Sequence, residues 1–121
     1  MKFCWVTLRV ENMEKSLEFY QGVLGLPVSS RHSGVGTEIV MLGEDGMPKV
    51  ELFCSGEKIY GDKGKGVSIG FEVPSLDKSL EEMKKKNFTI KGPFFPNSHV
   101  GFFFISDPDG YEIQLVENVK A

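Results

Sequence analysis

The chain has 121 residues, of which 40 % are hydrophobic and 26 % charged, values ordinary for one soluble globular domain. A formal net charge of −3 gives no basic excess that would favour nucleic acid or an anionic membrane. No apolar run is long enough to span a bilayer, residues 1–10 lack the apolar core of a signal peptide, and two cysteines are too few for a disulfide framework. We therefore expect a cytoplasmic protein without nucleic-acid or membrane partners.

The first half of the chain predicts a strand, a helix and three further strands. Residues 3–10 alternate in polarity and predict the first strand. Asn12 is a typical N-cap for the helix that follows, which we expect to end at Gly25, just before Pro27. The three later strands are expected near residues 28–31, 38–42 and 49–54.

The second half predicts the same order of elements. A strand over residues 67–73 precedes a helix that begins after Ser75 and ends near Asn87. Asp107-Pro-Asp-Gly110 is a strong hairpin turn, because Pro suits the second turn position and Gly the fourth. The three later strands are expected at residues 89–91, 100–105 and 111–117.

An internal repeat with an offset of 63 residues connects the two halves. Residues 10–18 and 73–81 are identical at five of nine positions, and the same offset aligns residues 50–52 with 113–115. The repeat predicts two βαβββ modules, at about 1–56 and 66–121, joined by a linker over 57–65.

Each predicted strand has one apolar and one mixed face, because side chains alternate across a strand. In the first strand the apolar face would pack on the helix, whereas Trp5, Thr7 and Arg9 share the mixed face. Cys4 and Cys54 fall on the apolar parity, so we expect them to be buried and inert. The mixed faces favour a semi-polar cavity, and solvated outer faces are the alternative.

Three segments resemble the vicinal oxygen chelate superfamily, which includes glyoxalase I, bleomycin resistance proteins and extradiol dioxygenases. They are residues 7–20, residues 23–27 (Val-Leu-Gly-Leu-Pro) and residues 107–115 (Asp-Pro-Asp-Gly-Tyr-Glu-Ile-Gln-Leu). The resemblance implies an α+β fold in which paired βαβββ modules form a single domain over residues 1–121. Two curved mixed sheets would surround a cavity, with the helices outside. It also implies a homodimer, and leaves open whether the modules pair within one chain or across the dimer.

The resemblance further implies four positions that hold a divalent metal ion in metal-dependent members. In this chain they are Trp5, Glu51, Ser68 and Gln114. Only Glu51 is of the usual ligand type, because an indole has no lone pair to give and a neutral hydroxyl or amide is a weak ligand. We therefore expect no metal and no other cofactor.

The candidate site has one acidic residue and a set of ligand-binding residues around it. Glu51 is the candidate catalytic base. Candidate ligand-binding residues are Trp5, Thr7, Arg9, Phe53, Ser68 and Gln114. Two alternatives stay open: Trp5 could fill a defunct site, and Arg9 could pair with Glu51 in the absence of any ligand.

Three functions are compatible with this pattern. The favoured one is a metal-free protein that binds a small organic molecule in an aromatic-lined cavity, as bleomycin resistance proteins bind their drug. The second is a glyoxalase-type lyase or isomerase that acts on a small carbonyl compound, with Glu51 as base and a divalent metal held by unexpected ligands such as His99. The third is a non-catalytic dimeric scaffold.

Overall fold

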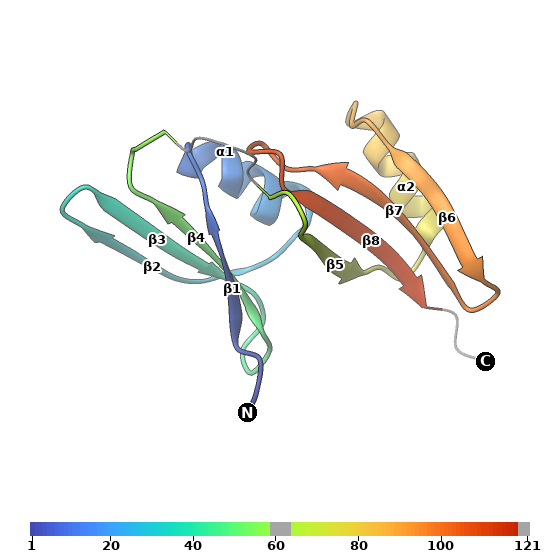
Figure 1. The fold of residues 1–121 in the computed structure, drawn as a ribbon, viewed down its shortest axis with the longest axis horizontal. Coiled ribbons are helices and arrows are strands. Elements are labelled where there is room, and N and C mark those ends of the chain that lie inside the picture. Colours follow the sequence, from blue (N-terminus) through green and yellow to red (C-terminus); the bar gives the residue numbers. More distant parts are fainter. Residues whose placement is uncertain (59–63, 119–121) are drawn as a thin grey trace. The chain divides into compact units, whose positions relative to one another are not determined.

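The computed structural model describes residues 1–58 and 64–118 and divides the chain into two units, Met1–Gly61 (unit 1) and Asp62–Ala121 (unit 2). Each unit has the order strand, helix, three strands, and each contains an open, mixed four-stranded sheet (Figure 1). The predicted α+β fold of paired βαβββ modules is therefore confirmed. Residues 59–63 of the expected linker and residues 119–121 lie outside the described residues.

In unit 1 the sheet order is β1-β4-β3-β2, with β1 parallel to β4 and the other neighbours antiparallel. The helical segment lies against β4. The elements are β1 (Trp5–Arg9), α1 (Met13–Leu17), η1 (Glu18–Val23), β2 (Val28–Gly34), β3 (Thr37–Leu42) and β4 (Lys49–Cys54).

Unit 2 repeats this arrangement as β5-β8-β7-β6, with α2 against β7 and β8 (Figure 1). The register repeats as well, because Trp5 pairs with Lys49 in unit 1 and Ser68 pairs with Glu112, each 63 residues later, in unit 2. The elements are β5 (Ser68–Glu72), α2 (Leu76–Lys85), β6 (Lys91–Asn97), β7 (Val100–Ser106) and β8 (Glu112–Asn118).

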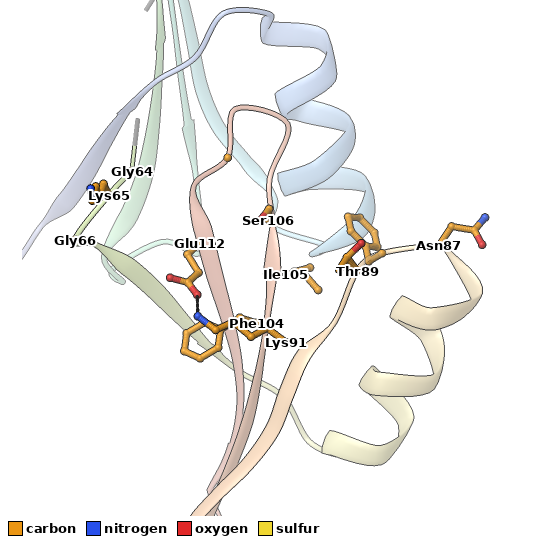
Figure 2. A pocket seen from close by; sticks show the side chains of 12 residues that line it. Gly64, Lys65, Gly66, Asn87, Thr89, Lys91, Phe104, Ile105, Ser106 and Glu112 are labelled. Atoms are coloured by element: carbon orange, nitrogen blue, oxygen red, sulfur yellow. Dashed lines mark hydrogen bonds and ion pairs between the residues drawn. The ribbon is translucent and has the colours of Figure 1, made fainter. Parts of the chain in front are cut away.

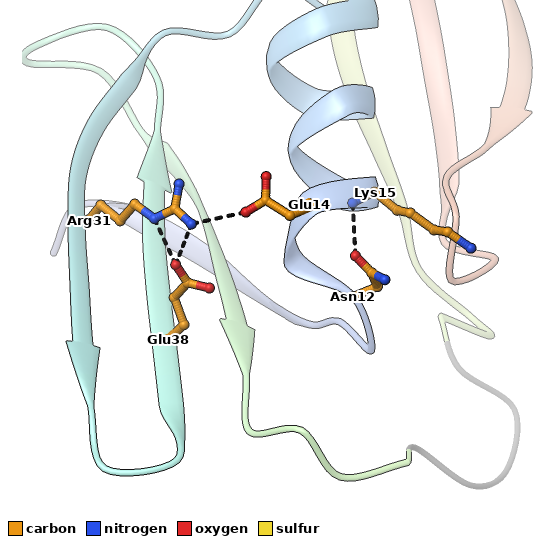
Figure 3. Close-up of polar contacts among 5 residues, drawn as sticks. All are labelled: Asn12, Glu14, Lys15, Arg31 and Glu38. Atoms are coloured by element: carbon orange, nitrogen blue, oxygen red, sulfur yellow. Dashed lines mark hydrogen bonds and ion pairs between the residues drawn. The ribbon is translucent and has the colours of Figure 1, made fainter.

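Both predicted N-caps are confirmed. The side-chain oxygen of Asn12 accepts a hydrogen bond from the backbone N–H of Lys15 at 3.0 Å (Figure 3), and that of Ser75 accepts one from Lys78 at 3.3 Å. Each bond satisfies a backbone N–H that the first helical turn leaves without a partner. The second helix ends at Lys85, close to the expected Asn87, whose φ of +64° turns the chain out of the helix.

The first helix differs from the expectation of one regular α-helix. Only Met13–Leu17 are α-helical, and Glu18–Val23 form a π-helix in which the N–H of Leu24 bonds to the carbonyl of Phe19, five residues back. The adjacent π-helical residues Phe19 and Tyr20 are both buried, with their rings packed edge to face at 5.0 Å.

The strand expected at residues 89–91 is also misplaced, because β6 runs from Lys91 to Asn97 and contains Pro93 and Pro96. Prolines are uncommon within strands because they lack a backbone N–H. They are tolerated because β6 is the edge of its sheet and its ladder with β7 is irregular, so a missing N–H costs little.

The buried apolar residues of each unit come from the helices and one face of the sheet, as the alternation predicted. Cys4 is exposed, contrary to expectation, because it precedes β1, and Cys54 is half-buried. Within the described ranges no helix is long and apolar enough to cross a membrane. The buried apolar residues are Leu8, Val10, Met13, Leu17, Phe19, Tyr20, Val40, Leu42, Val50 and Leu52 in unit 1, and Leu76, Met83, Phe103, Ile105, Ile113 and Leu115 in unit 2.

A polar cluster links α1 to the neighbouring strands β2 and β3 of unit 1 (Figure 3). The guanidinium group of Arg31 on β2 donates to Glu38 on β3 at 2.7 Å and to Glu14 on α1 at 3.1 Å. The hydrogen bonds to Glu38 and then Glu14 raise the pKa of Arg31 above its ordinary value. Arg31 and Glu14 are exposed and Glu38 is half-buried, and the cluster links the elements without being part of the candidate site.

Candidate functional site

Five of the predicted site residues share one face of the unit 1 sheet. Trp5, Thr7 and Arg9 alternate along β1 on the side opposite to buried Leu8. Parallel pairing sets Thr7 beside Glu51 and Arg9 beside Phe53 on β4. We call this group, Trp5, Thr7, Arg9, Glu51 and Phe53, the Trp5 face.

Two contacts organise the Trp5 face. The hydroxyl of Thr7 donates a hydrogen bond to Oε1 of Glu51 at 2.6 Å, and the guanidinium carbon of Arg9 lies 5.5 Å from the centre of the Phe53 ring. The neighbouring cation, Lys49, is held by its own loop, since its amine donates to backbone carbonyls of residues 44 and 47. The face thus presents one carboxylate, one guanidinium group and the indole of Trp5, which is 50 % exposed.

The two remaining predicted residues, Ser68 and Gln114, lie in unit 2 at the positions that correspond to Trp5 and Glu51. Ser68 is exposed on the edge strand β5, and Gln114 is half-buried on β8. Gly70 pairs with Gln114, and a Cβ on Gly70 would lie 3.2 Å from the Gln114 amide oxygen, so the glycine leaves room for this side chain. A single cavity that contains all seven residues stays a prediction.

The four positions that correspond to the metal-binding set do not offer a donor set suited to a transition-metal ion. The indole N–H of Trp5 can only donate, the Ser68 hydroxyl and Gln114 amide are weak ligands, and one oxygen of Glu51 already accepts from Thr7. Among the residues that the structure describes, no three His, Cys, Asp or Glu side chains gather as a metal site. His99, the alternative ligand considered above, is exposed in the turn between β6 and β7.

Unit 2 contains a pocket of about 660 Å³ that the sequence analysis did not predict (Figure 2). Lys91 and Glu112 line it and form an ion pair at 3.5 Å, beside the ring of Phe104. Strand alternation could have identified Glu112 as a candidate site residue, because it shares a face of its strand with Gln114. The expected strand at residues 89–91 includes Lys91 but gives no reason to place its side chain in a site, and no sequence signal shows that residues 64–66 line a pocket. The charged and polar side chains that line the pocket are Lys65, Asn87, Thr89, Lys91, Ser106 and Glu112.

Comparisons with known proteins agree with the fold. The profile of the Glyoxalase/Bleomycin resistance protein/Dioxygenase superfamily matches residues 2–115. The chain is 28 % identical to a lactoylglutathione lyase of Neisseria meningitidis, over 97 % of this chain and 91 % of that protein.

Two solved structures show the same fold. The trypanothione-dependent glyoxalase I of Leishmania major superposes with a TM-score of 0.83 at 24 % identity, covering 97 % of this chain and 86 % of the other. The antibiotic-binding protein TnmS3 of a Streptomyces species superposes with a TM-score of 0.75 at 18 % identity, covering 98 % and 96 %.

Proposed function

Because the chain belongs to the Glyoxalase/Bleomycin resistance protein/Dioxygenase superfamily, we propose that it binds a small organic molecule against the Trp5 face, without a metal cofactor. The observation that carries the proposal is Trp5 itself. This half-exposed indole occupies the position where the family resemblance places the first metal ligand, beside the Thr7–Glu51 hydrogen bond.

The chemistry of the Trp5 face suits a flat molecule with polar substituents. An indole offers a broad surface for stacking, which contributes about 0.5–1.5 kcal/mol beyond the burial of apolar area. Glu51 can accept a hydrogen bond from the ligand, and the guanidinium group of Arg9 can donate to a ligand oxygen or balance a negative charge on the ligand. A fold relative that binds an antibiotic, TnmS3, supports this class of ligand.

Fluorescence offers a direct test, since Trp5 is the only tryptophan in the chain. We expect bleomycin, or a member of a set of planar aromatic antibiotics, to quench Trp5 emission saturably and to raise the melting temperature. Trp5→Ala should weaken binding measured by calorimetry by about tenfold or more. Phe95→Ala, which removes an exposed ring from unit 2, is the matched control and should leave affinity unchanged. Equal affinity of the Trp5→Ala variant and the control would contradict the proposal.

The relative named lactoylglutathione lyase favours a second candidate, a glyoxalase-type lyase with Glu51 as base and a bound divalent metal. We expect protein prepared without chelators to carry no stoichiometric metal by elemental analysis. We also expect no turnover of methylglyoxal with glutathione when nickel or zinc is added. One equivalent of metal, or metal-dependent turnover that Glu51→Gln abolishes, would make the enzyme the better proposal.

A further inference from the structure

We propose that the unit 2 pocket is a second binding site, for a small organic anion: a carboxylate or phosphate group carried on an aromatic body. None of its lining residues belongs to the Trp5 face or to the pair Ser68 and Gln114. The inference rests on three features of the pocket: rigid walls, a loosely paired cation and an aromatic surface.

The hairpin between β7 and β8 forms one wall. Asp107, only 5 % exposed, accepts hydrogen bonds through Oδ1 from the backbone N–H groups of Asp109 and Tyr111, at 2.9 and 2.8 Å. Backbone bonds between Asp107 and Tyr111 and between Gly110 and Asp107 close the turn. Gly110 and Glu112, which line the pocket, are therefore held in place before any ligand arrives.

The segment 64–66 forms a second wall and rests on the first. The backbone of Gly64 lies so close to Tyr111 that a Cβ there would be 2.6 Å from Cδ1 of the ring, and its φ is +71°. Only glycine fits this position, because both the space and the backbone angle exclude a side chain. The contact places Lys65 on the pocket lining.

The charged groups of the pocket favour an anion. Its charged lining residues are Lys65, Lys91 and Glu112, which leave one net positive charge. Lys91 is 70 % exposed, and its contact with Glu112 is long for an ion pair, at 3.5 Å. Exposed pairs of this kind are weak, so a ligand anion can displace Glu112 from the lysine at little cost.

The other lining residues indicate which kind of ligand body the pocket suits. The Lys91 amine lies 5.5 Å from the centre of the Phe104 ring, so an anion bound to the amine lies next to an aromatic surface (Figure 2). Phe88 adds a second ring, and the hydroxyls of Thr89 and Ser106 can donate to ligand oxygens. A volume of about 660 Å³ lies within the range of pockets that hold small molecules.

The test is a titration of the full chain, followed by the chemical shifts of its backbone amides, with benzoate, phenyl phosphate and the neutral analogue benzamide. We expect benzoate or phenyl phosphate, but not benzamide, to shift residues 64–66, 87–91 and 104–112 saturably, with Kd at or below about 1 mM. The anion with the lower Kd identifies the head group that the pocket prefers.

Three variants test the role of charge. Lys91→Gln should weaken binding by about tenfold, and Glu112→Gln should tighten it, because it removes a competitor for the lysine. Lys85→Gln is the control, since Lys85 forms a similar exposed pair with Glu81 at 3.4 Å and does not line the pocket. Any one of three results would overturn the proposal. They are chemical-shift changes with benzamide equal to those with the anions, no saturation below about 10 mM, and equal affinities of the Lys91→Gln and Lys85→Gln variants. Trp5 fluorescence reports separately on the Trp5 face.

Discussion

At the scale of single residues, the candidate site is defined by a hydroxyl that points at a carboxylate. Thr7 and Glu51 are 44 residues apart in the chain and become neighbours only because β1 pairs in parallel with β4. The 2.6 Å bond fixes one oxygen of Glu51 and so orients the carboxylate on the face that carries Trp5.

A double-mutant cycle should measure this bond. We predict a coupling free energy of about 1 kcal/mol between Thr7→Val and Glu51→Ala in urea unfolding, because either single variant loses a hydrogen bond to a charged group and that bond is accessible to solvent. Strictly additive effects of the two substitutions would show that the hydroxyl and the carboxylate do not interact in solution.

In the hairpin between β7 and β8, the buried carboxylate of Asp107 accepts hydrogen bonds from two backbone N–H groups. We predict that Asp107→Ala lowers the free energy of unfolding by about 2 kcal/mol, because two backbone N–H groups lose a part-buried acceptor. Asp107→Asn keeps an oxygen there and should cost less. Asp45→Ala, in the exposed turn at the same place in unit 1, should change stability by less than about 0.5 kcal/mol. Similar losses for Asp107→Ala and Asp45→Ala would contradict this account.

At the scale of elements, the differences from the sequence-based expectations occur where the tertiary environment outweighs local preference. The π-helix η1 contains two adjacent buried aromatic residues, and β6 accommodates two prolines because it is an edge strand. The segment 64–66 is a third example, since its path depends on contact with Tyr111.

Two glycine substitutions separate the effect of that contact from the effect of the backbone angle. Gly64 and Gly66 have similar positive φ, +71° and +84°, but only Gly64 lies against Tyr111. We predict that Gly66→Ala costs about 1 kcal/mol, from backbone strain, and that Gly64→Ala costs at least about 1 kcal/mol more, from the clash. Equal unfolding free energies for the two variants would mean that the contact is not formed in solution.

At the scale of the whole molecule, the two modules share the same backbone arrangement but carry different side chains on the open faces of their sheets. The strand register is the same in both units, yet Arg9 and Lys49 of unit 1 correspond to Glu72 and Glu112 of unit 2. The helix-facing side stays apolar because burial constrains it, whereas the open face is free to take different charges. The candidate functions therefore belong to positions at which the two modules differ.

We predict that the protein is a homodimer. Large apolar side chains such as Phe3, Val67 and Phe95 are more than half exposed, and β1 and β5 are edge strands that a second copy could cover. Light scattering after size exclusion should give twice the mass of one chain. The mass of a single chain at about 100 µM would contradict the prediction.

The amino-acid sequence by itself determined the order of elements, both N-caps, the hairpin at Asp107 and the two βαβββ modules. These features depend on alternation, capping and turn residues, which act over a few positions in the chain, and on a repeat visible as an offset of 63 residues. Strand parity also placed Trp5, Thr7 and Arg9 on one face. Only the tertiary structure decided the Thr7–Glu51 bond, the π-helix and the pocket beside Lys91, because each depends on contacts between segments far apart in the chain or on burial that no local pattern encodes.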